Sequence, residues 1–293
     1  MDEPWEGDVE RVSRALGVEP AAWHESAGHG APSNRRWVVR LPSDLLVFVK
    51  IAAFDYTADW LRAEHAAYEA LDGLPFIPRL IGWDDDGRSP VLAIQSFVDA
   101  AWPPPWTPEG IDAVRATLEE VHAQPPPPHV HEMAHWRELL TSWSTVAADP
   151  EPALGLRLCS ARWLQEALPT LLEAESQAPL EGGSLLHMDV RSDNLCLDAG
   201  HAVLVDWNHA AKGNPQVDLA AWLPSLEAEG GPRPEEVFPD CPAGLAAILA
   251  GYFLSRAPLE PIPQAPHVRE LQVAQARTAL PWAARLLELP PPG

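Results

Sequence analysis

The stretch LLHMDVRSDNLCLDAGHAVLVDW, residues 185–207, constrains the fold more than any other part of this chain of 293 residues. Three short apolar runs in it are typical of buried strands, and the turn Asp198-Ala199-Gly200 predicts a hairpin between the last two. In that hairpin, residues whose numbers add up to about 400 face each other, which places Asn194 opposite Asp206. The polar residues at the ends of the runs are His187, Asp189, Asn194 and Asp206.

The facing oxygens of Asn194 and Asp206 suit a hard metal ion. A converging amide oxygen and carboxylate form the oxygen-rich site that Mg²⁺ prefers, with phosphate oxygens and water as further ligands. Asp189 lies beside them on the loop, where it can accept the proton of an alcohol during phosphoryl transfer. A solvated turn with capping side chains explains any one of these residues. The whole set, at the spacing H-x-D-x-x-x-x-N, favours a site.

Lysine is rare in this chain, which has 18 arginines and two lysines, and Lys50 ends the apolar run LLVFVK. A compact ammonium that reaches both phosphate oxygens and a carboxylate explains a lysine there; the alternative is a charge that protects an edge strand. The helix predicted over 57–72 places Glu64 on its apolar face, between Trp60 and Tyr68. Since a buried carboxylate is costly without a partner, we predict a Lys50–Glu64 ion pair.

The pattern of secondary structure changes near residues 98–106. Before this point we predict strands on both sides of the turn LPSD in 35–51, the helix over 57–72, and a hairpin with strands near 79–83 and 90–98 joined by DDDG. After it, apart from the 185–207 segment, helices are predicted at 110–123, 132–146, 160–176, 242–256 and 266–288. The sequence therefore predicts an α+β chain with a β-rich part of residues 1–98 and a mostly helical part of residues 99–293.

The charge of the chain restricts its partners. With 42 acidic and 20 basic residues, a formal net charge of −22, the chain would repel nucleic acid and anionic membranes. Residues 1–98 hold 16 acidic and 9 basic side chains, which leaves 26 and 11, net −15, for the helical part. That imbalance favours a cationic small molecule as a partner.

Cysteine content and hydropathy favour a cytoplasmic protein. Three cysteines without a C-x-x-C spacing fit neither a disulfide framework nor a zinc site. The acidic start MDEPWEGDVE is unlike a signal peptide, and the longest apolar run, 241–254, is too short to span a bilayer. We therefore expect no membrane association.

The order of these motifs resembles that of protein-kinase-like enzymes: VFVKIA, an inward Glu64, HMDVRSDN and then LVDW. The chain is most similar to the aminoglycoside phosphotransferase and choline kinase group, in which an aromatic residue other than Phe-Gly follows the metal-binding aspartate. Asp206-Trp207 and the later Asp218 match that variant. The resemblance covers most of residues 25–225. It implies a two-lobed fold with a small β-rich nucleotide-binding N-lobe and a larger helical C-lobe that carries the catalytic hairpin and binds the acceptor.

The resemblance also implies roles for single residues. Asp189 would be the catalytic base and Asn194 and Asp206 the Mg²⁺ ligands, while Lys50, held by Glu64, would contact the α- and β-phosphates. AIQSFVDA at 93–100 resembles the hinge that binds adenine through backbone groups, here those of Ser96 and Val98. The phosphate loop falls in SAGHGAPSNRRW, which lacks the full glycine pattern of protein kinases; we assign Ser33 and Asn34 to it. His187 and Asp218 would be structural supports.

The leading hypothesis is an ATP-dependent, Mg²⁺-assisted phosphotransferase that acts on a hydroxyl of a small molecule, with an aminoglycoside favoured by the charge. A catalytically inactive nucleotide-binding module of the same fold is one alternative. A metallohydrolase using His187, Asp189, Asp206 and His209 is another, although the spacing lacks an HxH or HExxH core. The sequence leaves open the identity of the acceptor, the choice between ATP and GTP, and the oligomeric state.

Overall fold

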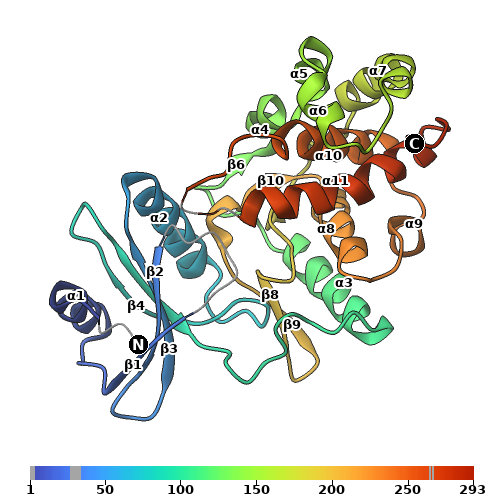
Figure 1. Ribbon diagram of the computed structural model, residues 1–293. Helices are drawn as coiled ribbons and strands as arrows, with labels where there is room; N and C mark the ends of the chain where they lie inside the picture. Colours follow the sequence, from blue (N-terminus) through green and yellow to red (C-terminus); the bar gives the residue numbers. More distant parts are fainter. Residues whose placement is uncertain (1–3, 27–33, 264, 266) are drawn as a thin grey trace.

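The computed structural model describes residues 4–26, 34–263, 265 and 267–293, which fold into two lobes (Figure 1). The predicted α+β class is confirmed. The small lobe contains α1 (Glu6–Leu16), β1 (Ala22–Glu25), β2 (Asn34–Arg40), β3 (Leu46–Ala52), α2 (Asp55–Ala70), β4 (Leu80–Asp84) and β5 (Val91–Gln95). The large lobe contains α3 (Pro108–His122), β6 (His131–Glu132), α4 (Met133–Leu140), α5 (Trp143–Ala148), α6 (Glu151–Gly155), α7 (Ala161–Ser176), β7 (Ser184–Leu186), β8 (Leu195–Asp198), β9 (His201–Leu204), the 3-10 helix η1 (Trp207–His209), β10 (Ala211–Gly213), α8 (Gln216–Ala228), α9 (Pro234–Val237), α10 (Ala243–Arg256) and α11 (His267–Leu286).

The small lobe is built on an antiparallel sheet with the strand order β1-β2-β3-β5-β4. Its register places Arg36 of β2 opposite Lys50 of β3, and Lys50 opposite Leu92 of β5. Because side chains alternate along a strand, these residues share one face of the sheet. The other face is apolar and includes Val47 and Val49, which pack against Val12 of α1.

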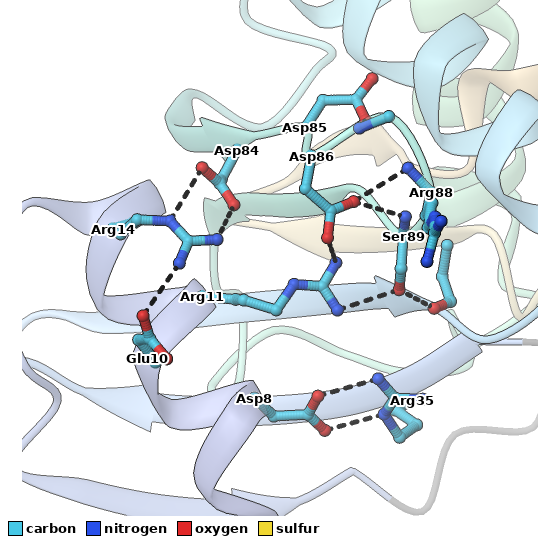
Figure 2. A network of polar contacts seen from close by, with 12 residues as sticks. Asp8, Glu10, Arg11, Arg14, Arg35, Asp84, Asp85, Asp86, Arg88 and Ser89 are labelled. Carbon is cyan, nitrogen blue, oxygen red and sulfur yellow. Dashed lines mark hydrogen bonds and ion pairs between the residues drawn. The ribbon is translucent and has the colours of Figure 1, made fainter.

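Helix α1, which the sequence analysis did not predict, is fixed to the sheet by ion pairs (Figure 2). The buried carboxylate of Asp8 accepts two hydrogen bonds from Arg35 of β2, both 2.8 Å long. Further along the helix, Arg14 donates to Asp84 at the end of β4 over 2.9 Å. The helix therefore joins β2 to β4 across the back of the sheet.

The predicted DDDG turn does connect β4 and β5. The carboxylate of Asp86 accepts hydrogen bonds from the backbone N–H groups of Arg88 and Ser89, over 2.9 and 2.8 Å. These bonds lower the pKa of Asp86 to about 2. Gly87 has a φ of 84°, a left-handed conformation that glycine adopts without strain.

The core of the large lobe is built around α10, which packs against α11, α7 and α5. The sequence alone could not assign the tryptophans of this lobe to core or pocket. Four of them, Trp143, Trp207, Trp222 and Trp282, are fully buried and belong to the core. Among the described residues, the chain has no helix that is both long and apolar enough to cross a bilayer.

The prediction of one helix over 132–146 was wrong, because the chain forms α4 and α5 with a break at Thr141 and Ser142. The cause is a buried carboxylate on a distant helix. Glu175 of α7 accepts the backbone N–H groups of Ser142, over 2.7 Å, and of Trp143, over 3.3 Å. The backbone N–H groups at the start of α5 therefore donate to the side chain of Glu175 and do not continue the hydrogen bonding of α4.

The hairpin of β8 and β9 has the predicted register. Leu195 of β8 pairs with Leu204 of β9, and the backbone N–H of Val205 donates to the carbonyl of Asn194 over 2.8 Å. Asn194 and Asp206 therefore lie at the open end of the hairpin, as the residue numbers predicted. In the large lobe, β6 and β7 flank β10 in a second small sheet.

Candidate active site

A cavity of about 1020 Å³ is lined by residues of both lobes. The small lobe contributes the sheet face that carries Arg36 and Lys50, together with Ser96 and Val98 after β5. From the large lobe come Asp206, the catalytic loop, the end of α8 and the start of α11. The cavity therefore brings together segments that are far apart in the sequence.

Lys50 lies at the centre of the contacts between the lobes. Its ammonium donates to both carboxylate oxygens of Glu64 of α2, over 2.8 and 3.0 Å, as predicted. It also contacts the carboxylate of Asp206 from the large lobe. Lys50 and Glu64 are 3% and 2% exposed, so this pair is shielded from solvent. Burial lowers the pKa of Lys50, and Glu64 opposes that effect.

Asp206 is placed by an unusual backbone conformation. It lies two residues after the end of β9 and has a φ of 64° and a ψ of 55°. Aspartate tolerates this left-handed region better than most residues, but the conformation still costs energy and is found more often at functional sites. It begins the 3-10 helix η1, against which α2 packs, so the turn also contributes to the contact between the lobes.

Asp189 is held in place from two sides. The amide nitrogen of Asn194 donates to its Oδ2 over 2.7 Å, and Arg191 Nε lies 3.0 Å from its Oδ1. Burial opposes ionisation, but the charge of Arg191 and the Asn194 hydrogen bond, with the His209 and His187 rings nearby, keep the pKa of Asp189 below its ordinary value. The lowered pKa keeps this carboxylate ionised, and its side chain, which is 29% exposed, is accessible.

The oxygen of the Asn194 side chain fits the predicted metal site. Its nitrogen is used by Asp189, whereas Oδ1 is buried and has no hydrogen-bond partner among the described residues. A buried amide oxygen without a partner is unfavourable unless something else binds it. Asp206 supplies a carboxylate at the same end of the hairpin, so the donor set is the one a hard cation prefers.

His187 and Asp218 contact the backbone of the catalytic loop. Asp218 is fully buried and accepts the N–H groups of His187 and Met188, both over 2.8 Å. Met188 has a φ of 71°, so these bonds hold a strained conformation just before Asp189. His187 Nε2 is 2.9 Å from the Val205 carbonyl, and its Nδ1 accepts the N–H of Asp189 over 3.3 Å.

The metallohydrolase alternative does not match this geometry. Both ring nitrogens of His187 are engaged by the backbone, so neither can bind a metal. Over the parts of the chain that the structure describes, no three His, Cys, Asp or Glu side chains gather in a way that could hold a metal ion.

Of the predicted phosphate-loop residues, Ser33 lies outside the described residues. Asn34 is the first residue of β2, and its Oδ1 is buried without a hydrogen-bond partner in the described structure. Ser96 and Val98 line the cavity, as expected for a hinge. Within the described ranges, their peptide groups make no hydrogen bond to protein.

Sequence reasoning missed two arginines of the site. Arg36 lines the cavity beside Lys50, and burial lowers its pKa while Glu64 and Asp193 oppose that effect. Arg191, two residues after Asp189, lies 3.2 Å from Asp193 as well as pairing with Asp189. The alternation of β2 could have identified Arg36, because it shares a face with Lys50 once the hairpin is aligned.

The fold has two lobes, with the buried Lys50–Glu64 pair in the small lobe and, in the large lobe, a hairpin with Asn194 and Asp206 at its open end and Asp189 on the loop before it. These features define a small-molecule kinase. The family model described as the phosphotransferase enzyme family matches residues 26–262. The chain belongs to this family.

Solved structures with the same fold extend over nearly the whole chain. An aminoglycoside phosphotransferase from Alicyclobacillus acidocaldarius has a TM-score of 0.64 at 15% identity, over 98% of this chain and 97% of its own. A putative fructosamine-3-kinase from Thermobifida fusca has a TM-score of 0.56 at 21% identity, over 94% and 99%. A choline/ethanolamine kinase family protein from Mesorhizobium loti has a TM-score of 0.56 at 14% identity, over 92% and 91%. Comparison with curated proteins gave no match.

Proposed function

We propose that this protein transfers the γ-phosphate of ATP to a hydroxyl group of a small molecule, with Mg²⁺ bound at the hairpin. The observation that carries the proposal is the position of Lys50. Its buried ammonium is held by Glu64 and reaches Asp206 of the other lobe. In kinases this arrangement positions a triphosphate between the sheet and the metal-binding aspartate.

The sheet face that would receive the phosphates is positively charged. Arg36 and Lys50 are directly opposite each other on β2 and β3. Like charges in that relation destabilise a sheet unless an anion lies beside them, and here Glu64 and Asp206 contact Lys50. The phosphates of a nucleotide would add further anionic partners on this face, and the peptide groups of Ser96 and Val98, which line the same cavity, are suited to bind its base. These features support ATP, or GTP, as the phosphate donor.

Asp189 is suited to act as the base. Its ionised carboxylate accepts the proton of the acceptor hydroxyl while the hydroxyl oxygen forms a bond to the γ-phosphorus. The bond from that phosphorus to the β-phosphate oxygen breaks, and the nucleoside diphosphate leaves. Asn194 orients the carboxylate, and the neighbouring charges keep it deprotonated at neutral pH.

Asn194 and Asp206 are the residues that would hold the metal ion. When bound, Mg²⁺ would neutralise part of the charge that develops on the phosphate oxygens. One solved structure with this fold is an amicoumacin kinase in complex with AMP-PNP and Ca²⁺; it matches this chain with a TM-score of 0.53 at 9% identity. The pairing of nucleotide and divalent cation in that protein supports the same pairing here.

The proposal is tested by Asp189→Asn, with Asp198→Asn as the matched control because Asp198 is exposed at the hairpin turn. We expect Asp189→Asn to lower turnover by ~10²–10⁴, the usual contribution of a positioned base. Stabilisation by Mg-ATP in a thermal-shift assay should persist in both variants. Undiminished turnover in Asp189→Asn would contradict the assigned role. Stabilisation by Mg-ATP without turnover of any alcohol would favour the inactive module instead.

Two finer expectations belong to the same proposal. A cytoplasmic location is supported by Cys159, Cys196 and Cys241, which are all buried free thiols. The net charge of the helical part favours a cationic acceptor such as an aminoglycoside.

A further inference from the structure

One face of helix α11 forms part of the cavity wall, beside the end of α8. The residues of α11 that line the cavity recur at i, i+3, i+4, i+7 and i+8, the spacing of a single helical face: His267, Glu270, Leu271, Ala274 and Gln275. Helix α8 contributes Ser225, Ala228 and Glu229. The hydroxyl of Thr278 donates to the carbonyl of Pro224 over 2.7 Å, which joins the two helices next to these residues. We call this surface the α8–α11 wall.

Gln275 is a buried residue of the α8–α11 wall whose amide has no protein partner. Only 7% of the residue is exposed, although it lines the cavity. Its backbone carbonyl accepts the hydroxyl of Thr278 over 3.0 Å, whereas its side-chain amide makes no hydrogen bond to any described residue. Unpaired polar groups at buried positions are costly and therefore rare. A ligand of the cavity is the expected partner of this amide.

Two further groups of the same wall have unused capacity for hydrogen bonds. His267 Nε2 is buried and has no partner in the described ranges. Ser225 is 7% exposed and donates its hydroxyl hydrogen to the carbonyl of Trp222 over 2.8 Å, so its oxygen can still accept. The wall therefore offers hydrogen-bonding groups from both helices.

The charged residues of the cavity give the α8–α11 wall little selectivity for charge. Asp206 contacts Lys50, and Asp193 lies 3.2 Å from Arg191, so these side chains neutralise one another. The two acids of the wall are exposed to solvent, where water and salt screen their charge: Glu229 and Glu270. The buried amide, which is not screened in this way, should decide which group of the acceptor binds.

The amide of Gln275 is fully paired only by a partner that both donates and accepts hydrogen bonds. An ammonium group can only donate, so it would leave the amide N–H groups unpaired. A carboxylate or a phosphate can only accept, so it would leave the amide oxygen unpaired. Two neighbouring hydroxyl groups do both, because one can donate to Oε1 while the other accepts from Nε2.

We propose that Gln275 binds two neighbouring hydroxyl groups of the acceptor, which is therefore a polyhydroxylated compound, a sugar or a polyol. The ribose of the nucleotide carries such a pair as well, but a cavity of about 1020 Å³ exceeds the ~300–1,000 Å³ typical of a site for one ligand. Glu229 of the wall accepts the hydroxyl of Ser192, three residues after Asp189, over 2.7 Å, which connects the wall to the catalytic loop. The inference rests on the proposed function, because it describes the second substrate of the same reaction.

The test varies hydroxyl content and charge independently. Glucose and tetrahydropyran-2-methanol are neutral and have the same ring, but the second has a single hydroxyl group. Kanamycin and choline are cations, and again only the second has a single hydroxyl group. Phosphorylation is followed as ADP release from Mg-ATP. We expect glucose or kanamycin to have a lower KM than its single-hydroxyl counterpart.

This comparison can overturn the inference in two ways. One is equal or better use of the single-hydroxyl compound in both pairs. The other is no turnover of either glucose or kanamycin by a protein that Mg-ATP stabilises. The proposed function fails separately, if Mg-ATP neither stabilises the protein nor is turned over with any compound.

Gln275→Met keeps the length of the side chain and removes its hydrogen-bonding groups. We expect the preference for the hydroxyl-rich compound to fall by about two- to tenfold, the effect of losing a neutral hydrogen bond, with the KM for Mg-ATP unchanged. The midpoint of thermal unfolding should not fall, because the amide has no described protein partner to lose. Gln272→Met is the matched control on the same helix. The oxygen of Gln272 accepts from Arg269 over 2.8 Å, so this variant should lose stability and keep the preference.

The variants separate three roles for Gln275. A preference that survives in Gln275→Met would overturn the inference, and a lower unfolding midpoint would then identify a structural glutamine. A rise in the KM for Mg-ATP alone would also overturn it, since the amide would then bind the ribose of the nucleotide. The ratio of the two acceptor KM values does not depend on the amount of folded protein. If Gln275→Met does not fold, Ser225→Ala on the same wall should reduce the preference instead, and an unchanged preference there would contradict the inference.

Discussion

The side-chain nitrogen of Asn194 lies 2.7 Å from Oδ2 of Asp189, which turns the Asn194 oxygen away from that carboxylate and leaves it without a partner among the described residues. In the proposed function one amide would serve both purposes: its nitrogen would orient the base, and its oxygen would be available to a cation. Asn194→Ala should remove both. We expect the concentration of Mg²⁺ needed for half-maximal turnover to rise by roughly 10–100-fold.

A magnesium titration of turnover at fixed ATP checks this expectation. Asn194→Asp separates the two uses, because it keeps an oxygen for the cation but replaces the donor to Asp189 with a negative charge. It should retain the response to Mg²⁺ while turnover falls. An unchanged Mg²⁺ requirement in Asn194→Ala would remove Asn194 from the metal site.

Glu64→Gln should weaken both folding and nucleotide binding. The substitution takes the carboxylate from a buried ammonium and leaves Lys50 with Asp206 as its acidic contact. Because Glu64 opposes the effect of burial, its loss would lower the pKa of Lys50 further. We expect a fall of roughly 1–3 kcal/mol in the free energy of unfolding, the range for hydrogen bonds to charged groups, and a higher KM for ATP.

Urea denaturation and steady-state kinetics measure the two effects of Glu64→Gln. The matched control is Glu69→Gln, on the opposite and exposed side of α2. Equal behaviour of the two variants would mean that the buried pair contributes nothing beyond an ordinary surface charge.

The Lys50–Glu64 pair could be predicted from the sequence because each residue broke a local pattern: a lysine in an arginine-rich chain, and a glutamate on an apolar helix face. The hairpin register could be predicted because the turn and both strands lie within about twenty residues of one another. Helix α8 had no such pattern. It is buried on most sides and contains Pro224, so its sequence lacks the alternation of polar and apolar faces that marks a surface helix.

Arg191 could not be predicted for a different reason. It is an ordinary residue in its own segment, and its significance depends on the carboxylates of Asp189 and Asp193, which the folded loop places beside it.

Asp218→Ala should disrupt the catalytic loop from beneath. Asp218 accepts the N–H groups of His187 and Met188, and without it two buried donors lose their partner while Met188 stays in a strained conformation. At ~1–3 kcal/mol for each unsatisfied group, a loss on the order of 2–4 kcal/mol is expected in the free energy of unfolding. Turnover should fall more than Mg-ATP binding does.

Chemical denaturation and nucleotide titration measure these two effects of Asp218→Ala. Asp240→Ala, at an exposed position, is the control. If Asp218→Ala is as stable and active as the control, the two hydrogen bonds are not what supports the loop.

His187 should make stability depend on pH. Burial lowers its pKa, although Asp218 and Asp189 oppose this, so the folded protein takes up the proton at lower pH than the unfolded chain does. The contribution of His187 to the free energy of unfolding is therefore complete above the pKa of His187 in the unfolded chain, ~6.5. It is lost as the pH falls below that value, by at most ~1.4 kcal/mol per pH unit. Turnover should fall in the same range, because a protonated Nδ1 cannot accept the N–H of Asp189.

The midpoint of thermal unfolding between pH 7.5 and 5 measures this dependence in the wild type, in His187→Gln and in His201→Gln, whose residue is exposed on β9. The slope should become shallower in His187→Gln alone, whatever its absolute stability. Equal slopes in all three proteins would assign the pH dependence to other groups.

The contact between Lys50 and Asp206 determines how the cation can enter. The carboxylate of Asp206 is neutralised by the Lys50 ammonium, so a free cation would have to displace a charge that the fold holds in place. A triphosphate that drew the ammonium toward its own oxygens would release that carboxylate. The metal should therefore arrive as a complex with the nucleotide, and the protein dialysed without nucleotide should bind Mg²⁺ only weakly.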